Sequence, residues 1–248
     1  MDEFIAGQRN NLDQVKQSPY FKELIGALDA AYRASVDSVP TAGFPPIFGR
    51  ILLVCHKSML SAATVIAQGQ PEDSVGITRR AVEAARVALA IKLDEENGTQ
   101  WTQYQKRHDR WLKRQQNEKP KSFQVQFKGL QGDVLIERMD THLGIMSDAS
   151  VHFTPEFYST LDWEVRHGAD GFGEFYLNYF QRNTREIALH LLGLGSTHKT
   201  ILESLDKCYD GCFQRDKASQ TKISEFVRLG VNLNEAYRRE YVDAERPD

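Results

Sequence analysis

Residues 47–68 read IFGRILLVCHKSMLSAATVIAQ, the densest run of apolar side chains in the chain. The run lies between Pro46 and Gly69, two residue types that commonly mark the ends of a helix. A polar break at residues 56–58 keeps it below the roughly 18 consecutive apolar residues that a membrane span needs. We therefore expect residues 47–68 to form the most buried helix of a protein that does not cross a membrane.

Helical periodicity extends over most of the remaining chain. Ser18-Pro19 places an N-cap before a proline at the first helical position, and Leu24, Leu28 and Ala31 keep the 3.6-residue period. Because strand signals are too few for a sheet, we expect an all-α fold in which helices pack their apolar stripes together as a bundle. The further helices that we expect span residues 2–17, 19–39, 71–94, 99–116, 133–146, 172–194, 195–208 and 213–244.

Length and composition are consistent with one helical domain over residues 1–248, since 41% of the 248 residues are hydrophobic. We expect residues 118–132, which include Pro120, to be a connection inside that domain. Residues 147–173 are the least regular stretch. We expect an irregular loop there, long enough to carry function.

Composition also limits the function classes. The formal net charge of −3 argues against a globally basic nucleic-acid binder, and we expect no reading of DNA sequence. The N-terminus lacks the basic and apolar regions of a signal peptide, so we expect a cytoplasmic protein with reduced thiols. Cys208 and Cys212 are three residues apart and have only His198 close in sequence, so we expect no metal site. No glycine-rich phosphate loop is present, and we expect no cofactor.

One local stretch is strongly basic. Between residues 105 and 128, eight Lys or Arg face two acidic residues, which gives a local charge of eight minus two, or about +6. Aromatic residues recur through its first part at helical spacing, as in the buried stripe of an amphipathic helix whose basic face is merely solvated. The second interpretation is a surface that contacts the phosphates of RNA. The residues that we expect to make those contacts are Arg107, Arg110, Lys113, Arg114 and Lys121.

A pair of opposite charges lies on one face of the helix expected over residues 71–94. Arg79 and Glu83 are four residues apart, and Arg86 joins the same side, largely opposite the apolar residues. The simpler interpretation is a solvated ion pair. The functional interpretation is a guanidinium that its carboxylate orients so that it binds an anion with two parallel hydrogen bonds.

A histidine lies in the expected loop. His152 follows Ser147 by five residues and precedes Pro155 by three. Because imidazole titrates near neutral pH, His152 suits a role in proton transfer, although loop histidines also serve as local hydrogen-bonding residues.

These two features together resemble a known pattern. A buried helix comes first, Arg79-Arg80-Ala-Val-Glu83 follows inside an apolar helix, and Ser147-Asp-Ala-Ser-Val-His152 lies further on, near a proline. This order resembles that of a family of uncharacterised bacterial helical proteins related to the HEPN (higher eukaryote and prokaryote nucleotide-binding) superfamily. The resemblance covers roughly Phe48 to Pro155. It implies a helical bundle that is often a homodimer, and in many members a metal-independent endoribonuclease of a bacterial toxin or phage-defence system.

The resemblance assigns roles to three residues. His152 would act as general base or acid in the attack of a ribose 2′-hydroxyl, Arg79 would stabilise phosphate charge, and Glu83 would hold Arg79. The Arg-to-His spacing that marks HEPN ribonucleases also occurs at residues 50–56 and 185–190, about as often as chance predicts for this composition. Both copies have a large side chain directly after the arginine, where the strict motif has a small polar one.

The alternative function is a non-catalytic helical module that binds a protein or a small anionic ligand. In that case the Arg79–Glu83 pair is architectural. The enzyme interpretation requires Arg79 and His152 to approach one pocket, whereas the interaction module allows them to lie far apart.

Overall fold

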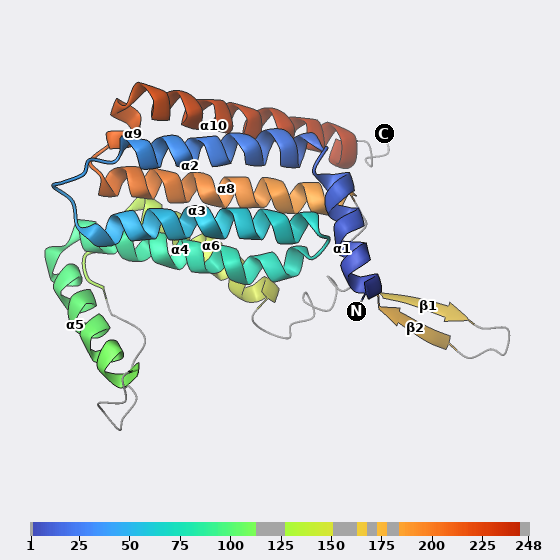
Figure 1. The fold of residues 1–248 in the computed structure, drawn as a ribbon, viewed down its shortest axis with the longest axis horizontal. Helices are drawn as coiled ribbons and strands as arrows, with labels where there is room; N and C mark the ends of the chain where they lie inside the picture. Colours follow the sequence, from blue (N-terminus) through green and yellow to red (C-terminus); the bar gives the residue numbers. More distant parts are fainter. Residues whose placement is uncertain (1, 113–126, 151–162, 168–172, 178–183, 244–248) are drawn as a thin grey trace.

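The computed structural model describes residues 2–112, 127–150, 163–167, 173–177 and 184–243, without the side chains of residues 3, 4, 107, 108, 110–112, 148–150 and the two strands. Helices make up most of it, and they pack side by side as a bundle (Figure 1). The elements are α1 (Asp2–Val15), the π-helical η1 (Tyr20–Ile25), α2 (Gly26–Ser38), α3 (Pro46–Ala67), α4 (Pro71–Leu93), α5 (Glu95–Leu112), α6 (Val134–Ser150), β1 (Trp163–His167), β2 (Gly173–Leu177), α8 (Thr184–Cys208), α9 (Cys212–Arg215), α10 (Lys217–Tyr237) and the π-helical η2 (Arg238–Val242). The expected all-α helical bundle is thus confirmed.

The apolar run at residues 47–68 forms α3, which pairs with α4 in an antiparallel hairpin. Gly69 turns the chain between them with φ 84°, a left-handed value that suits glycine, and Pro71 occupies the first turn of α4. Met59 of α3 and Ala85 of α4 are both fully buried. Alanines at the α4 interface let the two backbones approach closely, which places α4 firmly against the core.

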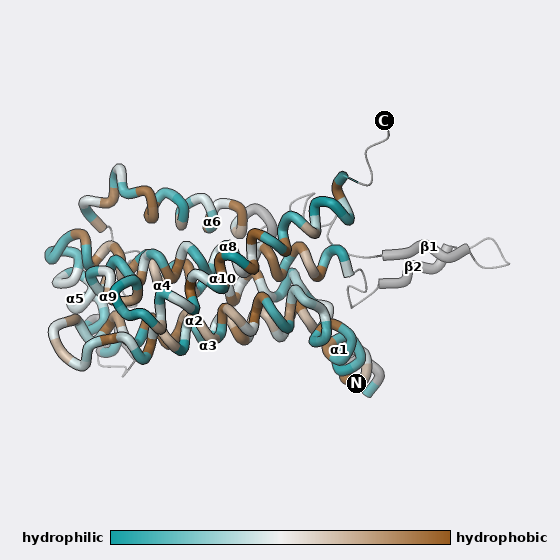
Figure 2. The backbone as a smooth tube through the Cα atoms, turned by 90° about the horizontal axis from the view of Figure 1, so that it is seen from above, coloured by the Kyte–Doolittle hydropathy of each residue, from teal (hydrophilic) through white to brown (hydrophobic). Residues whose placement is uncertain are grey.

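Helix α8 lies at the centre of the bundle. It contacts α3, α4, α6, α10 and η1, with α2 and α10 towards one edge of the bundle and α4 and α6 towards the other (Figure 1). A single cluster of buried apolar residues runs through all of these helices, from Leu24 of η1 to Phe226 of α10. From above, hydrophilic and hydrophobic residues alternate along each helix, as expected when only one side of it packs inward (Figure 2).

The structure differs from the sequence expectations between residues 147 and 208. The first four residues of the expected irregular loop, 147–150, continue α6, and residues 163–167 form β1. That strand pairs antiparallel with β2, where a helix over 172–194 was expected. Gly195 does not end a helix either, because α8 runs through it from Thr184 to Cys208.

Helix α3 also meets the length and composition of a membrane-crossing helix. Its most apolar 18-residue window has a mean hydropathy of 1.4, and 44% of that window is buried inside the bundle. The core helix of a soluble protein has the same properties.

Candidate anion-binding site

A polar contact between α4 and α6 joins two parts of the sequence motif. Arg79 Nε donates a hydrogen bond of 2.9 Å to Glu83 Oε1, one turn further along α4. Arg79 Nη1 donates a second, of 2.7 Å, to Ser147 Oγ in the last turns of α6. The Ser147 hydroxyl donates its own proton to the Leu143 carbonyl at 2.8 Å, so its lone pairs are available to Arg79. The guanidinium is therefore held from two helices.

A second arginine strengthens the same helix contact. Arg86 lies two turns after Arg79 on α4 and donates from Nε to Asp140 Oδ1 at 2.6 Å and from Nη2 to Oδ2 at 3.4 Å. Sequence analysis placed Arg86 on the correct side of α4 but did not identify Asp140 as its partner. Because this forked pair anchors α6 on α4, it fixes the position of Ser147 relative to Arg79.

The Arg79 site is open to solvent. The side chain of Arg79 is 30% exposed and that of Glu83 is 51% exposed. Two of the five guanidinium N–H groups donate to Glu83 and Ser147, and the other three make no hydrogen bond to the residues that the structure describes. An oriented guanidinium with unused donors can bind a phosphate or carboxylate through parallel hydrogen bonds. As an exposed ion pair it adds only about 0.3–0.5 kcal/mol to stability.

Not all of the expected site is within the described residues. His152, the expected proton carrier, lies outside them, as do Lys113, Arg114 and Lys121. Ser147, five residues before His152 in the sequence, is described. The structure therefore brings Arg79 and Glu83 together with the first residue of the Ser147–His152 motif, and the approach of His152 stays a prediction.

The basic stretch begins on α5, which extends away from the bundle (Figure 1). Arg107 and Arg110 belong to this helix, although their side chains are not described. At the start of α5 the buried Asn97 donates to the Ala90 carbonyl at 2.8 Å and exchanges two hydrogen bonds with the backbone of Lys128, of 2.9 and 2.8 Å. These bonds tie the far end of the basic stretch to the beginning of α5.

Residues of the two HEPN-type Arg-to-His spacings contact other helices of the bundle. His56 Nε2 lies 2.6 Å from Asp29 Oδ1, in a pair between α3 and α2. The Arg185 guanidinium lies 5.9 Å from the centre of the Tyr241 ring, a cation–π distance. His190, on α8, is partly buried, and burial lowers its pKa. His56 and Arg185 thus each contact another helix of the bundle.

A buried polar group in the core was missed by sequence analysis. Tyr32 of α2 and His198 of α8 are both fully buried, and the Tyr32 hydroxyl lies 2.7 Å from His198 Nδ1. On its other side Tyr32 stacks on His56, with ring centres 5.1 Å apart and planes 8° apart. His198 Nε2 is buried with no hydrogen-bond partner among the described residues. Burial and, second to it, the neighbouring His56 lower the pKa of His198 to about 3.

The three cysteines differ in their burial. Cys55 and Cys208 are fully buried, and burial raises the pKa of each thiol to about 12. Cys212 is half-buried, and its sulfur accepts a contact of 3.3 Å from Arg215. Among the residues that the structure describes, no three His, Cys, Asp or Glu side chains are grouped so as to hold a metal ion.

No family model, curated protein or solved structure matches this chain. The resemblance to the HEPN superfamily therefore rests on the residues of the sequence itself.

Proposed function

We propose that this protein binds RNA at Arg79 and cleaves it without a metal ion, within a bacterial toxin or defence system. The observation that supports the proposal is the two-point hold on Arg79 by Glu83 and Ser147. A guanidinium held in this way keeps its orientation, and the three of its N–H groups that make no hydrogen bond to the described residues can donate to a phosphate. Fixing the donor before the phosphate arrives lowers the entropic cost of binding it.

The proposed chemistry follows from that position. A phosphodiester held by Arg79 would place the adjacent ribose 2′-hydroxyl for attack on phosphorus, and His152 would remove the hydroxyl proton. The bond from phosphorus to the 5′-oxygen of the next nucleotide would break, which leaves a 2′,3′-cyclic phosphate, and protonated His152 would return its proton to the departing 5′-oxygen. Negative charge that develops on the phosphate oxygens would be stabilised by Arg79, and Glu83 and Ser147 would keep the guanidinium in place. Arg79, Glu83 and His152 thus remain the proposed catalytic set, with Ser147 added as a positioning residue.

Replacing Arg79 with Ala is expected to weaken the binding of single-stranded RNA about tenfold or more. A hydrogen-bonded contact to a charged group contributes about 1.5–3 kcal/mol, which corresponds to that change in Kd. The measurement is fluorescence anisotropy with a labelled oligoribonucleotide at low salt. Thermal unfolding of the variant checks that the fold is retained.

The matched control is Arg33→Ala. Arg33 donates to Asp29 at 2.8 Å, which is another i, i+4 pair, and its side chain is 69% exposed. The control removes one positive charge and a similar ion pair from α2, so it should leave the Kd almost unchanged. Equal loss of affinity in both variants would mean that only net charge matters, and would contradict a site at Arg79.

The basic stretch makes a separate contribution in this proposal. Replacing Arg107, Arg110 and Arg114 together with Ala is expected to reduce the slope of log K against log salt by roughly two units, because each neutralised phosphate of a single strand releases about 0.7 counterion. The same anisotropy measurement, repeated over a range of salt concentrations, gives the slope. An unchanged slope in the triple variant would leave these arginines as a solvated helix face.

A non-catalytic interaction module is the second candidate function. Three large apolar side chains of α3 point away from the core, with exposures of 57% for Leu53, 46% for Val54 and 40% for Leu60. Leu53 and Leu60 are seven residues apart and so lie on one helix face, and exposed apolar residues that share a face are typical of a protein-binding surface. A homodimer, which we also propose, would be formed through this face of α3. RNA binding that is absent at low salt would favour the interaction module.

A further inference from the structure

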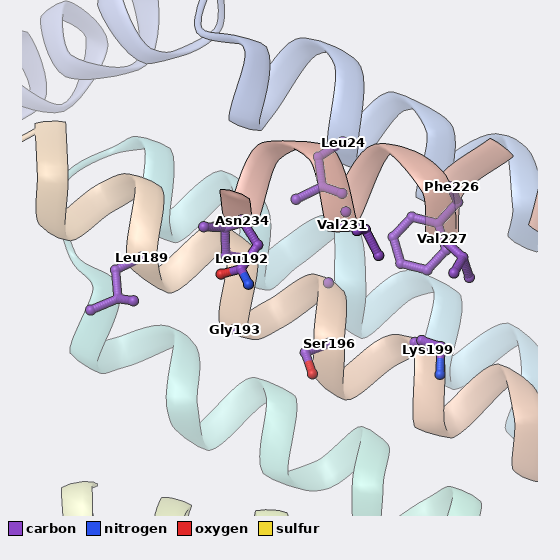
Figure 3. Close-up of a pocket in the computed structure, with 12 residues that line it drawn as sticks. Leu24, Leu189, Leu192, Gly193, Ser196, Lys199, Phe226, Val227, Val231 and Asn234 are labelled. Carbon is purple, nitrogen blue, oxygen red and sulfur yellow. The ribbon is translucent and has the colours of Figure 1, made fainter. Parts of the chain in front are cut away.

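Cavities along two parts of α10 differ in the charge of their walls. A groove between α8 and α10 has a volume of about 400 Å³ and mainly apolar walls, such as Leu192 and Val231 (Figure 3). The charged residues along this groove and its continuation are two cations and two anions, namely Lys199, Arg228, Glu203 and Asp206. Because these charges balance, the groove selects neither an anionic nor a cationic ligand.

The second cavity, which we call the η2 cavity, lies at the end of the bundle. There α1 and η1 meet the beginning of α8, the end of α10 and η2 (Figure 1). Its volume of about 370 Å³ is within the range of small-molecule sites, and Val15, Ile187 and Leu233 give it apolar walls. Of the described residues that line it, Glu240 alone carries a charge. The lining of the η2 cavity is therefore negative.

Two tyrosine rings of the η2 cavity lie near that carboxylate. Tyr20 of η1 is 9% exposed, and Tyr241 of η2 is half-buried, with its ring centre 5.1 Å from that of the buried Tyr237. A hydrogen bond with Glu240 raises the pKa of Tyr241, and burial followed by the charge of Glu240 raises the pKa of Tyr20. Both phenols therefore stay neutral at pH 7, and both sense the Glu240 carboxylate.

The Tyr241 ring already contacts one cation of the protein. The Arg185 guanidinium lies 5.9 Å from its centre, within the range of a cation–π interaction. Arg185 is not among the residues that line the η2 cavity. The cavity itself therefore offers a cation two aromatic rings and one carboxylate.

We infer that the η2 cavity binds a small organic cation with an alkylated ammonium group. The ammonium group lies beside Glu240 and against the rings of Tyr20 and Tyr241, and its alkyl part lies against Ile187 and Leu233. The rings attract a desolvated cation through their π faces, and the carboxylate pairs with its charge. Alkylation suits apolar walls, because a primary ammonium would leave N–H donors unpaired there. This site is independent of the proposed RNA site, because none of its lining residues belongs to α4 or α6.

The test uses the full chain and two probes of the same shape. Choline carries a trimethylammonium group where 3,3-dimethylbutan-1-ol carries a neutral tert-butyl group. Each probe gives one methyl signal in proton NMR, so titration with the protein yields both Kd values in the same way. Choline is expected to bind about tenfold or more tightly than the alcohol, because cation–π attraction and charge pairing act on choline alone. Equal affinity for the two probes, or no binding of choline, would overturn the inference.

A pair of charge variants locates the carboxylate. Glu240→Gln should weaken the binding of choline about fivefold or more and leave the affinity for the alcohol unchanged. The matched control is Glu235→Gln, which removes the same charge from an exposed residue of α10 outside the cavity lining and should leave both affinities unchanged. Equal loss of choline affinity in the two variants would mean that only net charge matters, and the inference would be wrong.

A pair of ring variants locates the aromatic contact. Tyr241→Leu should weaken the binding of choline about fivefold, whereas Tyr241→Phe keeps the ring and should bind it within about twofold of the wild type. Circular dichroism checks that both variants keep the helix content of the wild type. If Tyr241→Phe loses as much affinity as Tyr241→Leu, the ring makes no cation–π contact and the inferred site is refuted.

Discussion

Acidification from pH 7 to pH 5 is expected to lower the free energy of unfolding by about 2 kcal/mol through His198 alone. In the folded protein burial holds the pKa of His198 near 3, so the residue stays neutral at pH 5. In the unfolded chain it takes up a proton as the pH falls through about 6.5. The unfolded state then binds more protons than the folded state, and stability is lost as the pH falls.

The groups discussed next either lower stability as the pH falls, as His198 does, or do not change their charge between pH 7 and pH 5. Burial also lowers the pKa values of His142 and His190. Tyr32 and Cys55, which lie near His198 on α2 and α3, have raised pKa values and stay neutral. For Asp29, burial opposes the charge, but hydrogen bonds from His56 and Arg33 outweigh it and lower the pKa, so Asp29 remains ionised.

Urea unfolding at pH 7, 6 and 5 measures the effect, and His198→Leu should flatten it. This variant leaves the Tyr32 hydroxyl unpaired, at a cost of about 1–3 kcal/mol at pH 7, and adding Tyr32→Phe should recover part of that loss. His142→Leu is the matched control, because His142 is only half-buried and should contribute less to the slope. Equal pH slopes in the wild type and in His198→Leu would show that His198 is not the acid-sensitive group.

His152→Ala is expected to reduce ribonuclease activity at least about a hundredfold, because a positioned general acid or base contributes about 10²–10⁴ in rate. The substitution removes the proposed proton carrier and leaves Arg79, Glu83 and Ser147 in place, so RNA binding should change little. Cleavage of a labelled RNA in the presence of a metal chelator gives the activity, and circular dichroism checks that helix content is retained.

His190→Ala is the control for this experiment. His190 belongs to the Arg185-to-His190 spacing, but Arg185 lies against the ring of Tyr241. Loss of the His190 side chain should therefore have little effect on the rate of RNA cleavage. If His190→Ala abolishes cleavage and His152→Ala does not, the roles assigned to the two histidines are wrong. If neither the wild type nor the variants cleave RNA, the interaction module becomes the better proposal.

The parts of the fold that local sequence predicts well are those with strong periodicity and clear ends. The apolar run at 47–68 became α3 over Pro46–Ala67, and Pro71 opened α4 as expected. The predicted helix boundary at Gly195 was wrong, because this glycine serves a contact with a residue far away in the sequence. It allows close contact with Leu24, and nothing in the neighbouring residues distinguishes that role from helix termination.

The candidate site shows the same limit. The i, i+4 spacing was enough to pair Arg79 with Glu83, since helix geometry alone brings them together. Ser147 and Asp140 were not recognised as partners of α4, because they lie 68 and 54 residues away from Arg79 and Arg86. Tyr32 and His198, 166 residues apart, meet only once the whole bundle has packed.

The central position of α8 has a consequence for folding during synthesis on the ribosome. Helices α3 and α4 are complete at Leu93, but the helix that covers their inner faces begins at Thr184, 91 residues later. At about 5–20 residues per second, roughly 5–20 s pass before translation reaches that helix. During this interval the faces of α3 and α4 that later pack on α8 are exposed to solvent, where a chaperone or the wrong partner can reach them first.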